Sequence, residues 1–494
     1  MSHETYLGQK GYSIYKKSLS LKEQLFIRNE LTVKPYIPKA PVQPPEYPIY
    51  RESTNKFYIP RFFGMNTFGE PNETRIEKGN TIDLTFAGSL RDNQMIIVQK
   101  YIKFINGGNI GGLLDLYTGF GKTVLALQII ALVGRKTLII VHKGFLVDQW
   151  IERINQFLPN ARIGRIQGQI IDIEDKDIVI GMLQSLSMKE YPDDQFESFG
   201  LTICDEVHHI SAEVFVRALQ KVVTTHTLGL SATMTRKDGL SKVFKMFLGD
   251  IIHKEKREGE NTVVVKAIEF KVDDEEFNEI EYDYRGNPKY STMISKLCNF
   301  NIRSELILFI ITNELKINPN QQIMILAHNK CLLVYLYKAI EYRKIATVGY
   351  YIGGMKQKDL KISETKQIVI ATYSMASEGL DIKTLTTLIL ATPKTDIEQA
   401  VGRIMRVKHN NPLIIDIIDN HSLFKNQWNK RKTFYQKNNY KIIYTDNYKN
   451  DKWSDIAKKP SAKDKKNQIC VENIDNIDSK EIVLIGKCMV SLEI

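Results

Sequence analysis

A glycine turn between an apolar run and an apolar helix carries residue types that can bind phosphate. The stretch LLDLYTGFGKTVLALQIIALVG contains the turn Gly119–Thr123. Glycines let several backbone N–H groups point into one cup at a helix N-terminus, which suits an anion. In such a turn Lys122 would reach the β- and γ-phosphates of a nucleotide, and the Thr123 hydroxyl would ligate Mg²⁺. The strict phosphate-loop pattern has a glycine five residues before Gly121, where this chain has Leu116, so an ordinary strand–turn–helix is the alternative.

Two acids close an apolar run further along the chain. Asp205 and Glu206 end the run LTICDE, and Asp205 follows Lys122 by 83 residues. In open α/β sheets, ligands bind beyond the carboxyl ends of the strands, so we expect both acids beside the glycine turn. Phosphoryl transfer to water needs a metal that spreads charge and a group that orients the water. Asp205 fits the first role and Glu206 the second.

Basic, amide and hydroxyl side chains elsewhere could complete such a site. Arg403 and Arg406 in QAVGRIMR are three residues apart and would share one face of a helix. Two guanidiniums on one face suit a triphosphate across a cleft, and a basic surface pair is the alternative. The Gln94 amide in LRDNQ can donate and accept, which suits an adenine edge. Ser231 and Thr233 in SAT could relay contacts between domains.

The elements around these residues alternate between strands and helices in two blocks. Strand candidates of the first block, residues 86–258, read TLIIVH, DIVIGM, LTICDE and THTLGLSA. Those of the second, residues 259–445, read VVVKAIEF, QIMILAH, ATVGYYI, QIVIAT, TTLILAT and PLIIDII. Short apolar strands alternating with helices imply a parallel sheet covered on both faces. We therefore predict an α/β chain of two tandem domains, with an N-terminal accessory region at 1–85 and a basic C-terminal tail at 446–494.

The two ends of the chain differ from these blocks in composition. Residues 34–48 are rich in proline and predict an extended segment. Residues 59–69, IPRFFGMNTFG, predict an aromatic segment that packs on the core, with stacking on bases as the alternative. Residues 421–440 carry aromatic residues and one arginine at helical spacing and predict a helix packed on the second domain. Its buried residues would be Phe424, Trp428, Arg431 and Tyr435.

Charge and cysteine content narrow the class of protein. The 494 residues carry a net charge of +11, and residues 425–466 hold 13 Lys/Arg against 4 Asp, a net of +9 that leaves +2 for the rest. A basic tail on a near-neutral body suggests a polyanion partner, with a solvated surface as the alternative. Five scattered cysteines argue against a disulfide framework or zinc site and for an intracellular, reducing compartment. The sequence contains no apolar run of 18 residues, so we expect no membrane-spanning helix.

The motifs RDNQ, TGFGKT, DEVH, SAT, AT…EGLD and QAVGRIMR follow one another across the two blocks. This ordered set resembles the superfamily 2 helicases of the DExH type over roughly residues 90–445. The resemblance implies two RecA-like domains with ATP in the cleft and a nucleic-acid strand across both. GLSATMTRKDGL resembles the GLTATPxRxDGL signature of the XPB, phage UvsW-like and restriction-subunit branch, although Met234 stands where proline is usual. The nearest type is the vaccinia-like DNA helicase of large cytoplasmic DNA viruses, which releases transcripts from the polymerase.

The resemblance also implies roles for individual residues. Lys122, Glu206, Arg403 and Arg406 would act in catalysis, and Thr123 and Asp205 would hold Mg²⁺. The other ATP contacts would be Arg91, Gln94, Thr118, Gly119, Phe120, Gly121, Gly379 and Asp381. Residues that couple hydrolysis to strand movement would be His208, Ser231, Thr233 and Gln399. Strand contacts would come from loop backbone and from hydroxyls such as Thr372. The tail has little apolar content, so we assign sequence-independent phosphate contact to Lys458, Lys459, Lys463, Lys465 and Lys466.

These observations predict an enzyme that uses ATP and Mg²⁺ to move along nucleic acid. We expect a DNA helicase, with 3′ to 5′ polarity by resemblance to the branch, acting in transcript release or DNA repair. RNA polymerase or other transcription proteins would be partners, and a viral protein of this type would act in the virion and the cytoplasmic viral factory. A duplex translocase that does not unwind, an RNA helicase, and a nucleic-acid-binding protein with an inactive ATPase fold remain alternatives.

Overall fold

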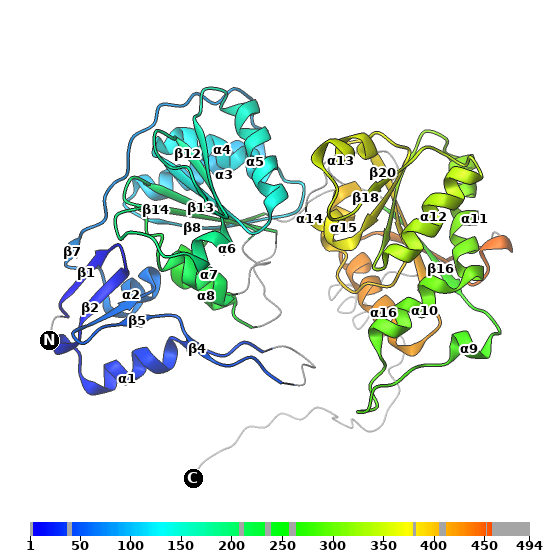
Figure 1. The fold of residues 1–494 in the computed structure, drawn as a ribbon, viewed down its shortest axis with the longest axis horizontal. Helices are drawn as coiled ribbons and strands as arrows, with labels where there is room; N and C mark the ends of the chain where they lie inside the picture. Colours follow the sequence, from blue (N-terminus) through cyan, green and yellow to red (C-terminus); the bar gives the residue numbers. More distant parts are fainter. Residues whose placement is uncertain are drawn as a thin grey trace, which may run out of the picture.

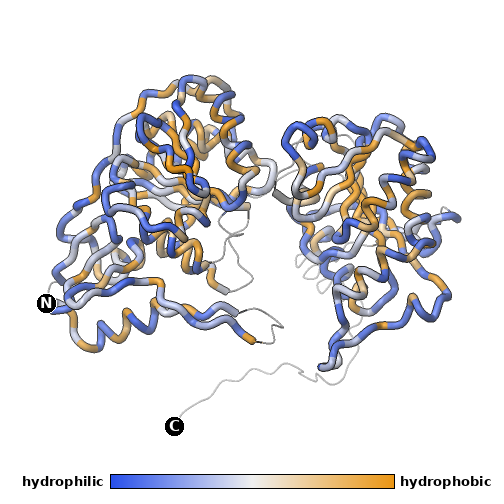
Figure 2. Tube along the Cα trace, in the orientation of Figure 1, coloured by the Kyte–Doolittle hydropathy of each residue, from blue (hydrophilic) through white to orange (hydrophobic). Residues whose placement is uncertain are grey.

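The computed structural model describes residues 3–36, 42–206, 212–232, 239–255, 263–378, 382–404, 412–450 and 452–456. These residues form two α/β domains, each built on an eight-stranded sheet, and a smaller N-terminal sheet beside the first domain (Figure 1). Apolar residues are concentrated along the central strands of both domains, and polar residues lie on the periphery (Figure 2). No helix in the described part of the chain is long and apolar enough to cross a membrane.

The sheet of the first domain has the order β11-β10-β12-β9-β13-β14-β8-β15. Its strands are β8 (Gly111–Leu116), β9 (Thr137–Val141), β10 (Ile163–Gln167), β11 (Ile170–Ile171), β12 (Ile178–Met182), β13 (Leu201–Asp205), β14 (His226–Ser231) and β15 (Ile251–Glu255). All pairings are parallel except that of β11 with β10. Every residue of β8, β9 and β13 is buried, as expected for parallel strands that are covered on both faces.

Two layers of helices cover this sheet. One face packs against α3 (Asp92–Asn106), α4 (Lys122–Val133) and α5 (Gly144–Phe157). The other face packs against α6 (Leu183–Met188), α7 (Ala212–Leu219) and α8 (Ser241–Leu248). Successive residues of each strand therefore enter different core clusters; Leu113 lies in one and Leu114 in the other.

The second domain repeats this architecture with the order β18-β19-β17-β20-β21-β16-β22-β23. Its strands are β16 (Val264–Phe270), β17 (Gln322–Ala327), β18 (Val348–Tyr351), β19 (Ile368–Thr372), β20 (Leu385–Leu390), β21 (Leu413–Asp419), β22 (Lys441–Thr445) and β23 (Ser454–Asp455). Only β23 pairs antiparallel within this sheet.

Helices again lie on both faces of the second sheet. One core cluster joins the sheet to α9 (Glu275–Asn278), α10 (Tyr290–Asn299), α11 (Asn301–Ile317) and α12 (Lys330–Tyr342). The other joins it to α13 (Gln357–Glu364), α14 (Tyr373–Glu378), α15 (Glu398–Ile404) and α16 (Ser422–Lys437). The two domains are thus α/β units with parallel sheets flanked by helices, as the sequence predicts.

The N-terminal region forms a five-stranded sheet of its own, in the order β5-β6-β2-β1-β7. Its strands are β1 (Thr5–Gly8), β2 (Gly11–Tyr15), β5 (Arg51–Glu52), β6 (Lys56–Ile59) and β7 (Glu73–Thr74), with α1 (Leu21–Glu30) and α2 (Arg61–Phe68) beside them. A short hairpin of β3 (Thr32–Val33) and β4 (Tyr47–Pro48) follows α1. The apolar side chains of this sheet belong to the same core cluster as α6, α7 and α8, so the region packs on the first domain.

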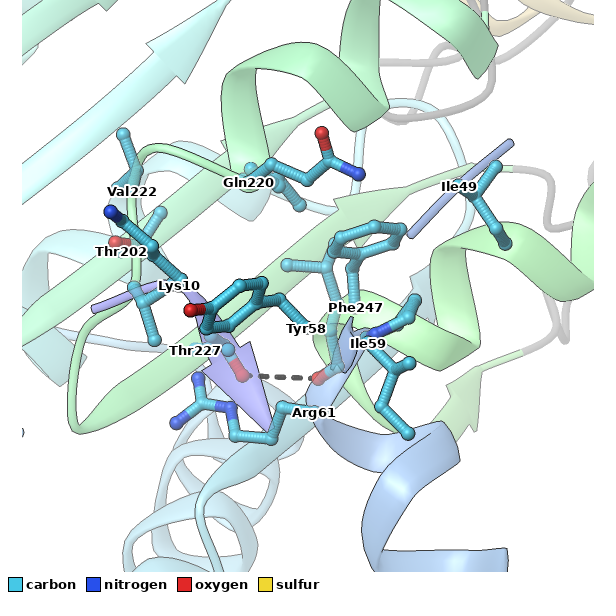
Figure 3. Close-up of a pocket in the computed structure, with 15 residues that line it drawn as sticks. Lys10, Ile49, Tyr58, Ile59, Arg61, Thr202, Gln220, Val222, Thr227 and Phe247 are labelled. Carbon is cyan, nitrogen blue, oxygen red and sulfur yellow. Dashed lines mark hydrogen bonds between the residues drawn. The ribbon is translucent and has the colours of Figure 1, made fainter. Parts of the chain in front are cut away.

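Arg61, at the start of α2, joins the N-terminal region to the first domain. Its side chain is buried, and Nη1 donates to the carbonyl oxygens of Thr224 at 2.8 Å and Thr225 at 3.4 Å. A cavity of about 30 Å³ lies at this junction between β6 and α8 (Figure 3). Such a volume holds about one water molecule. On its wall, the Thr227 hydroxyl donates to the Leu248 carbonyl at 3.0 Å.

The predicted strands are present in both blocks, but the sequence did not reveal every element. The alternating exposure of β10 and the polar residues of β15 hid two strands of the first sheet. The N-terminal sheet was also not predicted, because its strands span only two to five residues. The aromatic segment at 59–69 forms α2, whose Phe63 enters the core as predicted. The second sheet continues to Asp455, ten residues beyond the predicted end of the second block at residue 445.

Candidate active site

The glycine turn lies between β8 and α4, at the carboxyl edge of the first sheet. Gly119 and Gly121 have φ values of 87° and 92°, in the left-handed region that favours glycine. A Cβ atom on Gly121 would lie 2.5 Å from the Gln94 side-chain nitrogen, so a larger residue there would displace the Gln94 amide. Helix α4 starts at Lys122, and its first N–H groups lie at the turn.

Gln94 and Arg91 support this turn from behind. The Gln94 amide donates to the Phe120 carbonyl at 2.8 Å and accepts from the Arg91 backbone N–H at 3.0 Å. The Arg91 guanidinium also donates to the Phe120 carbonyl. Gln94 is only 5% exposed. In this structure both side chains therefore fix the shape of the turn, and contact with adenine stays a prediction.

The two acids lie at the carboxyl end of β13 as predicted, with Asp205 as its last residue, and are beside the turn. Lys122 Nζ is 2.8 Å from Glu206 Oε1, and the Trp150 indole N–H donates to Asp205 Oδ2 at 3.0 Å. Burial, and secondly the charge of Glu206, raise the pKa of Asp205 to about 6, while Lys122 and Trp150 oppose this rise. Glu206 has a φ of 50°, an unusual conformation for a residue with a side chain.

A cleft of about 470 Å³ joins these groups to the second domain. From the first domain it is lined by Thr118, Gly119, Gly121, Lys122, Thr123, Asp205 and Glu206 and by residues of α5; from the second, by Gln357, Lys361, Glu364, Lys383, Gln399 and Arg403. The size is within the usual range for a small-molecule site. The cleft therefore brings predicted residues from both domains to one cavity.

Helix α15 makes direct contact with the turn across this cleft. A Cβ atom on Gly402 would lie 2.8 Å from the Thr118 side chain, so the helix backbone approaches the turn closely. Arg403 is buried, and its Nε donates to the Ala376 carbonyl at 2.9 Å, which ties α15 to α14. Lys361 on α13 and Glu152 on α5 form an ion pair of 3.3 Å between the domains.

The residues at the cleft fit the groups that the sequence predicts there. A bound nucleotide needs N–H donors and a cation for its phosphates, and the glycine turn and Lys122 supply these. The cleft supplies the volume for the nucleotide. Thr123 and Asp205 would hold Mg²⁺ together with phosphate oxygens. Among the described residues no group of three or more His, Cys, Asp or Glu could hold a metal ion.

The other predicted residues are distributed as follows. Ser231 ends β14 and is buried, and Gln399 lines the cleft. Thr372 ends β19, at the carboxyl edge of the second sheet, where its hydroxyl lies 3.3 Å from that of Ser374. The remaining predicted residues lie outside the described part of the chain: His208, Thr233, Gly379, Asp381, Arg406, Lys458, Lys459, Lys463, Lys465 and Lys466.

Sequence reasoning missed the walls of the cleft. Helix α5 contributes Gln149, Trp150, Arg153 and Gln156 to the lining. Gln149, Arg153 and Gln156 recur at intervals of four and three residues, which places them on one face of a helix. This polar stripe is a signal in the sequence, but it is also what any solvated helix face shows. Only the position of α5 over the cleft shows that this stripe lines a cavity and is not an ordinary solvated helix face.

Comparisons with known proteins identify the family. Residues 87–236 match the family "Type III restriction enzyme, res subunit", and residues 305–409 match "Helicase conserved C-terminal domain". The chain is 35% identical over 453 residues to the "Putative ATP-dependent RNA helicase L396" of Acanthamoeba polyphaga mimivirus, covering 89% of this chain and 86% of that protein. It is 29% identical to the "Putative helicase 161L" of Invertebrate iridescent virus 6, covering 73% and 85%.

Among solved structures, "The crystal structure of T4 UvsW" aligns with 90% of this chain and 100% of that chain at 17% identity. Its TM-score of 0.35 is too low to carry a conclusion. The family of the chain follows instead from two other findings. These are the identity and coverage of the mimivirus relative and the match to two helicase families in tandem. With two α/β domains that share one cleft, the chain belongs to the superfamily 2 helicases, which are ATP-dependent enzymes that act on nucleic acid.

Proposed function

We propose that this protein is a DNA helicase that moves 3′ to 5′ along a strand and hydrolyses ATP in the cleft between its domains. One observation carries the proposal: Lys122, Asp205 and Glu206 of the first domain share a cavity with Gln399 and Arg403 of the second. A site divided in this way links nucleotide occupancy to the relative position of the domains. Closure around ATP and opening after hydrolysis would then move the two domains along the strand.

The roles of the cleft residues follow from their contacts. Lys122 neutralises Glu206 at 2.8 Å when no phosphate is near. When Lys122 turns to a terminal phosphate, Glu206 becomes free to accept a proton from the attacking water. Thr123 and Asp205 would hold Mg²⁺, which when bound spreads the charge of the phosphates. Arg403 and Arg406 would meet the charge that develops in the transition state from the opposite wall.

Several features support DNA and a place in viral transcription. The GLSATMTRKDGL segment resembles the XPB and UvsW-like branch, and both relatives named above are viral proteins. Release of transcripts from an RNA polymerase in the cytoplasmic viral factory is the process that suits this combination. RNA is the second candidate substrate, because the printed name of the mimivirus relative is that of an RNA helicase.

The decisive experiment measures ATP turnover with single-stranded DNA, duplex DNA and RNA side by side. We expect single-stranded DNA to stimulate turnover most, and strand displacement to require a 3′ tail. Stimulation by duplex DNA without displacement would instead identify a duplex translocase. Stimulation by RNA alone would identify an RNA helicase, and phosphate release at the uncatalysed rate would identify an inactive ATPase fold.

A further inference from the structure

Four consecutive backbone carbonyls in the second domain are each held by a different element. The segment Ala391–Lys394 connects β20 to the loop before α15, and we call it the clamped segment. Its carbonyl oxygens accept, in order, from Arg303 Nη1 at 2.8 Å, Tyr373 OH at 2.5 Å, Tyr290 OH at 3.0 Å and Arg431 Nη1 at 2.9 Å. These donors come from α11, α14, α10 and α16. A connecting segment more commonly meets water at its carbonyls.

The two arginine donors are themselves immobilised. Arg303 donates two bonds to Asp419, at 2.6 and 2.8 Å, and both side chains are 0% exposed. Arg431 donates two bonds of 2.8 Å to Asp416 and is equally buried. A buried ion pair of this geometry does not exchange partners readily, because either charge alone would be stranded away from water. The clamped segment is therefore fixed to the sheet from two sides.

Of the two remaining donors, Tyr373 lies at the edge where we expect the nucleic-acid strand, and the ring centroid of Tyr290 is 6.1 Å from that of His328 at the same edge. Tyr373 directly follows Thr372, the predicted strand contact at the end of β19. The neighbouring strand β17 ends at Ala327, which pairs with Thr372, and the next residue is His328. The backbone N–H of His328 donates to the Thr392 hydroxyl at 3.0 Å, and this hydroxyl lies 2.8 Å from His328 Nδ1. A shift of this edge would thus reach Thr392 through short, partly buried contacts.

The clamped segment also leads directly to the cleft. After Lys394 the chain enters α15, which carries Gln399 and Arg403 into the cleft and places Gly402 against Thr118 of the glycine turn. Hydrogen-bond networks and rigid elements that connect two sites can carry energetic coupling between them. The hydrogen bonds at Ala391–Lys394 supply such a connection between the strand edge and the nucleotide cleft.

We propose that Tyr373 is a positioning residue: its hydroxyl, bonded to the Thr392 carbonyl, transmits strand binding at the end of β19 to α15 in the cleft. Tyr290, bonded to the Pro393 carbonyl, shares this role. Neither tyrosine is expected to touch nucleotide or metal. The inference rests on the proposed function, because it assumes that a strand binds at this edge.

The test is Tyr373→Phe, which removes one hydroxyl and keeps the ring. ATP turnover is measured without nucleic acid and with increasing single-stranded DNA, below the unfolding temperature. We expect unstimulated turnover and the affinity for DNA to stay within about 2-fold of the parent protein. Turnover at saturating DNA should fall roughly 5-fold, the scale expected when one hydrogen bond is removed. Tyr290→Phe should show the same pattern, and it provides the test if the first variant does not fold.

Tyr101→Phe is the matched control. Tyr101 is buried and donates its hydroxyl to a backbone carbonyl, that of Thr227, at 2.9 Å, but it lies in the first domain at the amino end of β14. We expect a comparable loss of thermal stability and no change in stimulation. Equal loss of basal and stimulated turnover in Tyr373→Phe, or full stimulation, would overturn the inference. Absence of stimulation in the parent protein would instead refute the proposed function.

Discussion

Lys122 and Glu206 form an ion pair of 2.8 Å in the cleft, so each is the other's partner until a phosphate arrives. The carboxylate is held close to where a terminal phosphate would lie, yet it is neutralised there. Glu206 also has an unusual φ of 50°, which the fold maintains at this one position after β13. Strained geometry combined with a directly opposed charge is typical of a residue placed for chemistry rather than for stability.

Glu206→Gln tests this role. The amide keeps the size and hydrogen bonding of the carboxylate but cannot take a proton, so ATP should still bind while turnover falls by at least about 10²-fold. Binding is followed with a fluorescent ATP analogue and turnover by phosphate release. Glu152→Gln, on α5 in the same cleft, is the control and should keep near-normal turnover, since its ion pair with Lys361 is solvent-exposed. Normal turnover in Glu206→Gln would refute the assignment.

His328 should make the stability of the protein depend on pH. Burial, and secondly the charge of Lys394, lower its pKa to about 4 from an ordinary 6.5. The unfolded chain therefore takes up a proton near pH 6.5, and the folded one only near pH 4. The free energy of unfolding should be highest above pH 6.5, fall as pH drops toward 4, and lose no more from this residue below that. At about 1.4 kcal/mol per pKa unit, His328 can change the free energy of unfolding by at most about 3 kcal/mol over this range. The partial exposure of its side chain reduces this contribution.

Comparison with His328→Asn isolates this contribution. Asparagine keeps an acceptor for the Thr392 hydroxyl and does not titrate, so its stability should decline less between pH 6.5 and 4. Denaturant unfolding at fixed ionic strength measures both proteins across this range. All other titrating groups contribute equally to the two, and parallel pH curves would contradict the assignment.

At the scale of elements, α16 confirms the helix predicted from aromatic spacing, with Phe424, Trp428, Arg431 and Tyr435 all buried. Its attachment to β21 depends on a polar group as well as on apolar packing. Asp416 accepts two bonds from Arg431 and one from Tyr435, each at 2.8 Å, and the ion pair is 1% exposed on both sides.

Replacing only one partner of this ion pair should lower the free energy of unfolding more than replacing both partners. Arg431→Met leaves Asp416 buried without a counter-charge, so we expect a loss of about 3–5 kcal/mol in the free energy of unfolding. A triple variant with Asp416→Leu and Tyr435→Phe leaves no buried charge behind and should be clearly more stable than the single variant, although both lose the bond from Arg431 to the Lys394 carbonyl. Urea unfolding followed by tryptophan fluorescence measures both. Additive losses would show that the three groups do not act together.

At the scale of the whole molecule, the described contacts between the two domains include one ion pair and the close approach of Gly402 to Thr118. The Lys361–Glu152 pair joins α13 to α5 across the cleft, and both side chains are about half exposed. Such a pair stabilises by about 0–1 kcal/mol, so it permits the domains to separate and close again. By contrast, the N-terminal sheet shares an apolar core with α7 and α8 and should move with the first domain as one body.

The basic tail is predicted to bind phosphates without entering the cleft. Replacing Lys458, Lys459, Lys463, Lys465 and Lys466 with glutamine should weaken DNA binding. The slope of log affinity against log salt should fall by about 0.7 for each lysine–phosphate interaction that the substitutions remove. Turnover at saturating DNA should stay unchanged. Fluorescence anisotropy at several salt concentrations gives the slope, and an unaltered slope would mean that these lysines only solvate the surface.

The matched control carries the same change in charge at five exposed lysines away from the tail. These are Lys22, Lys103, Lys316, Lys338 and Lys344, on α1, α3, α11 and α12 and just after α12. If the tail acts by local contact, this control should change the salt slope less than the tail variant does. Equal slopes would show that net charge alone, rather than the position of the tail lysines, sets the affinity.

The sequence by itself determined those features that depend on neighbours along the chain. Runs such as TLIIV predict buried parallel strands because both faces of each strand are apolar, and β9 confirms this. The glycine turn and the acids after β13 also follow from local pattern, since parallel strands deliver their carboxyl ends to one edge. The helical spacing of Trp428 and Tyr435 belongs to the same class of evidence.

Only the tertiary structure decided which distant side chains meet. The Gln94 amide donates to the Phe120 carbonyl, 26 residues away, and no local pattern indicates this contact. Nothing local marks Tyr373 and Arg431 as donors to carbonyls of one short segment, because these partners are brought together by the packing of α14 and α16 on the second sheet. Hydrogen bonds of this kind depend on position to within a fraction of an ångström. A periodic pattern in the sequence specifies which face of a helix or strand is buried. The packing of whole helices and strands then determines which distant side chains come into contact.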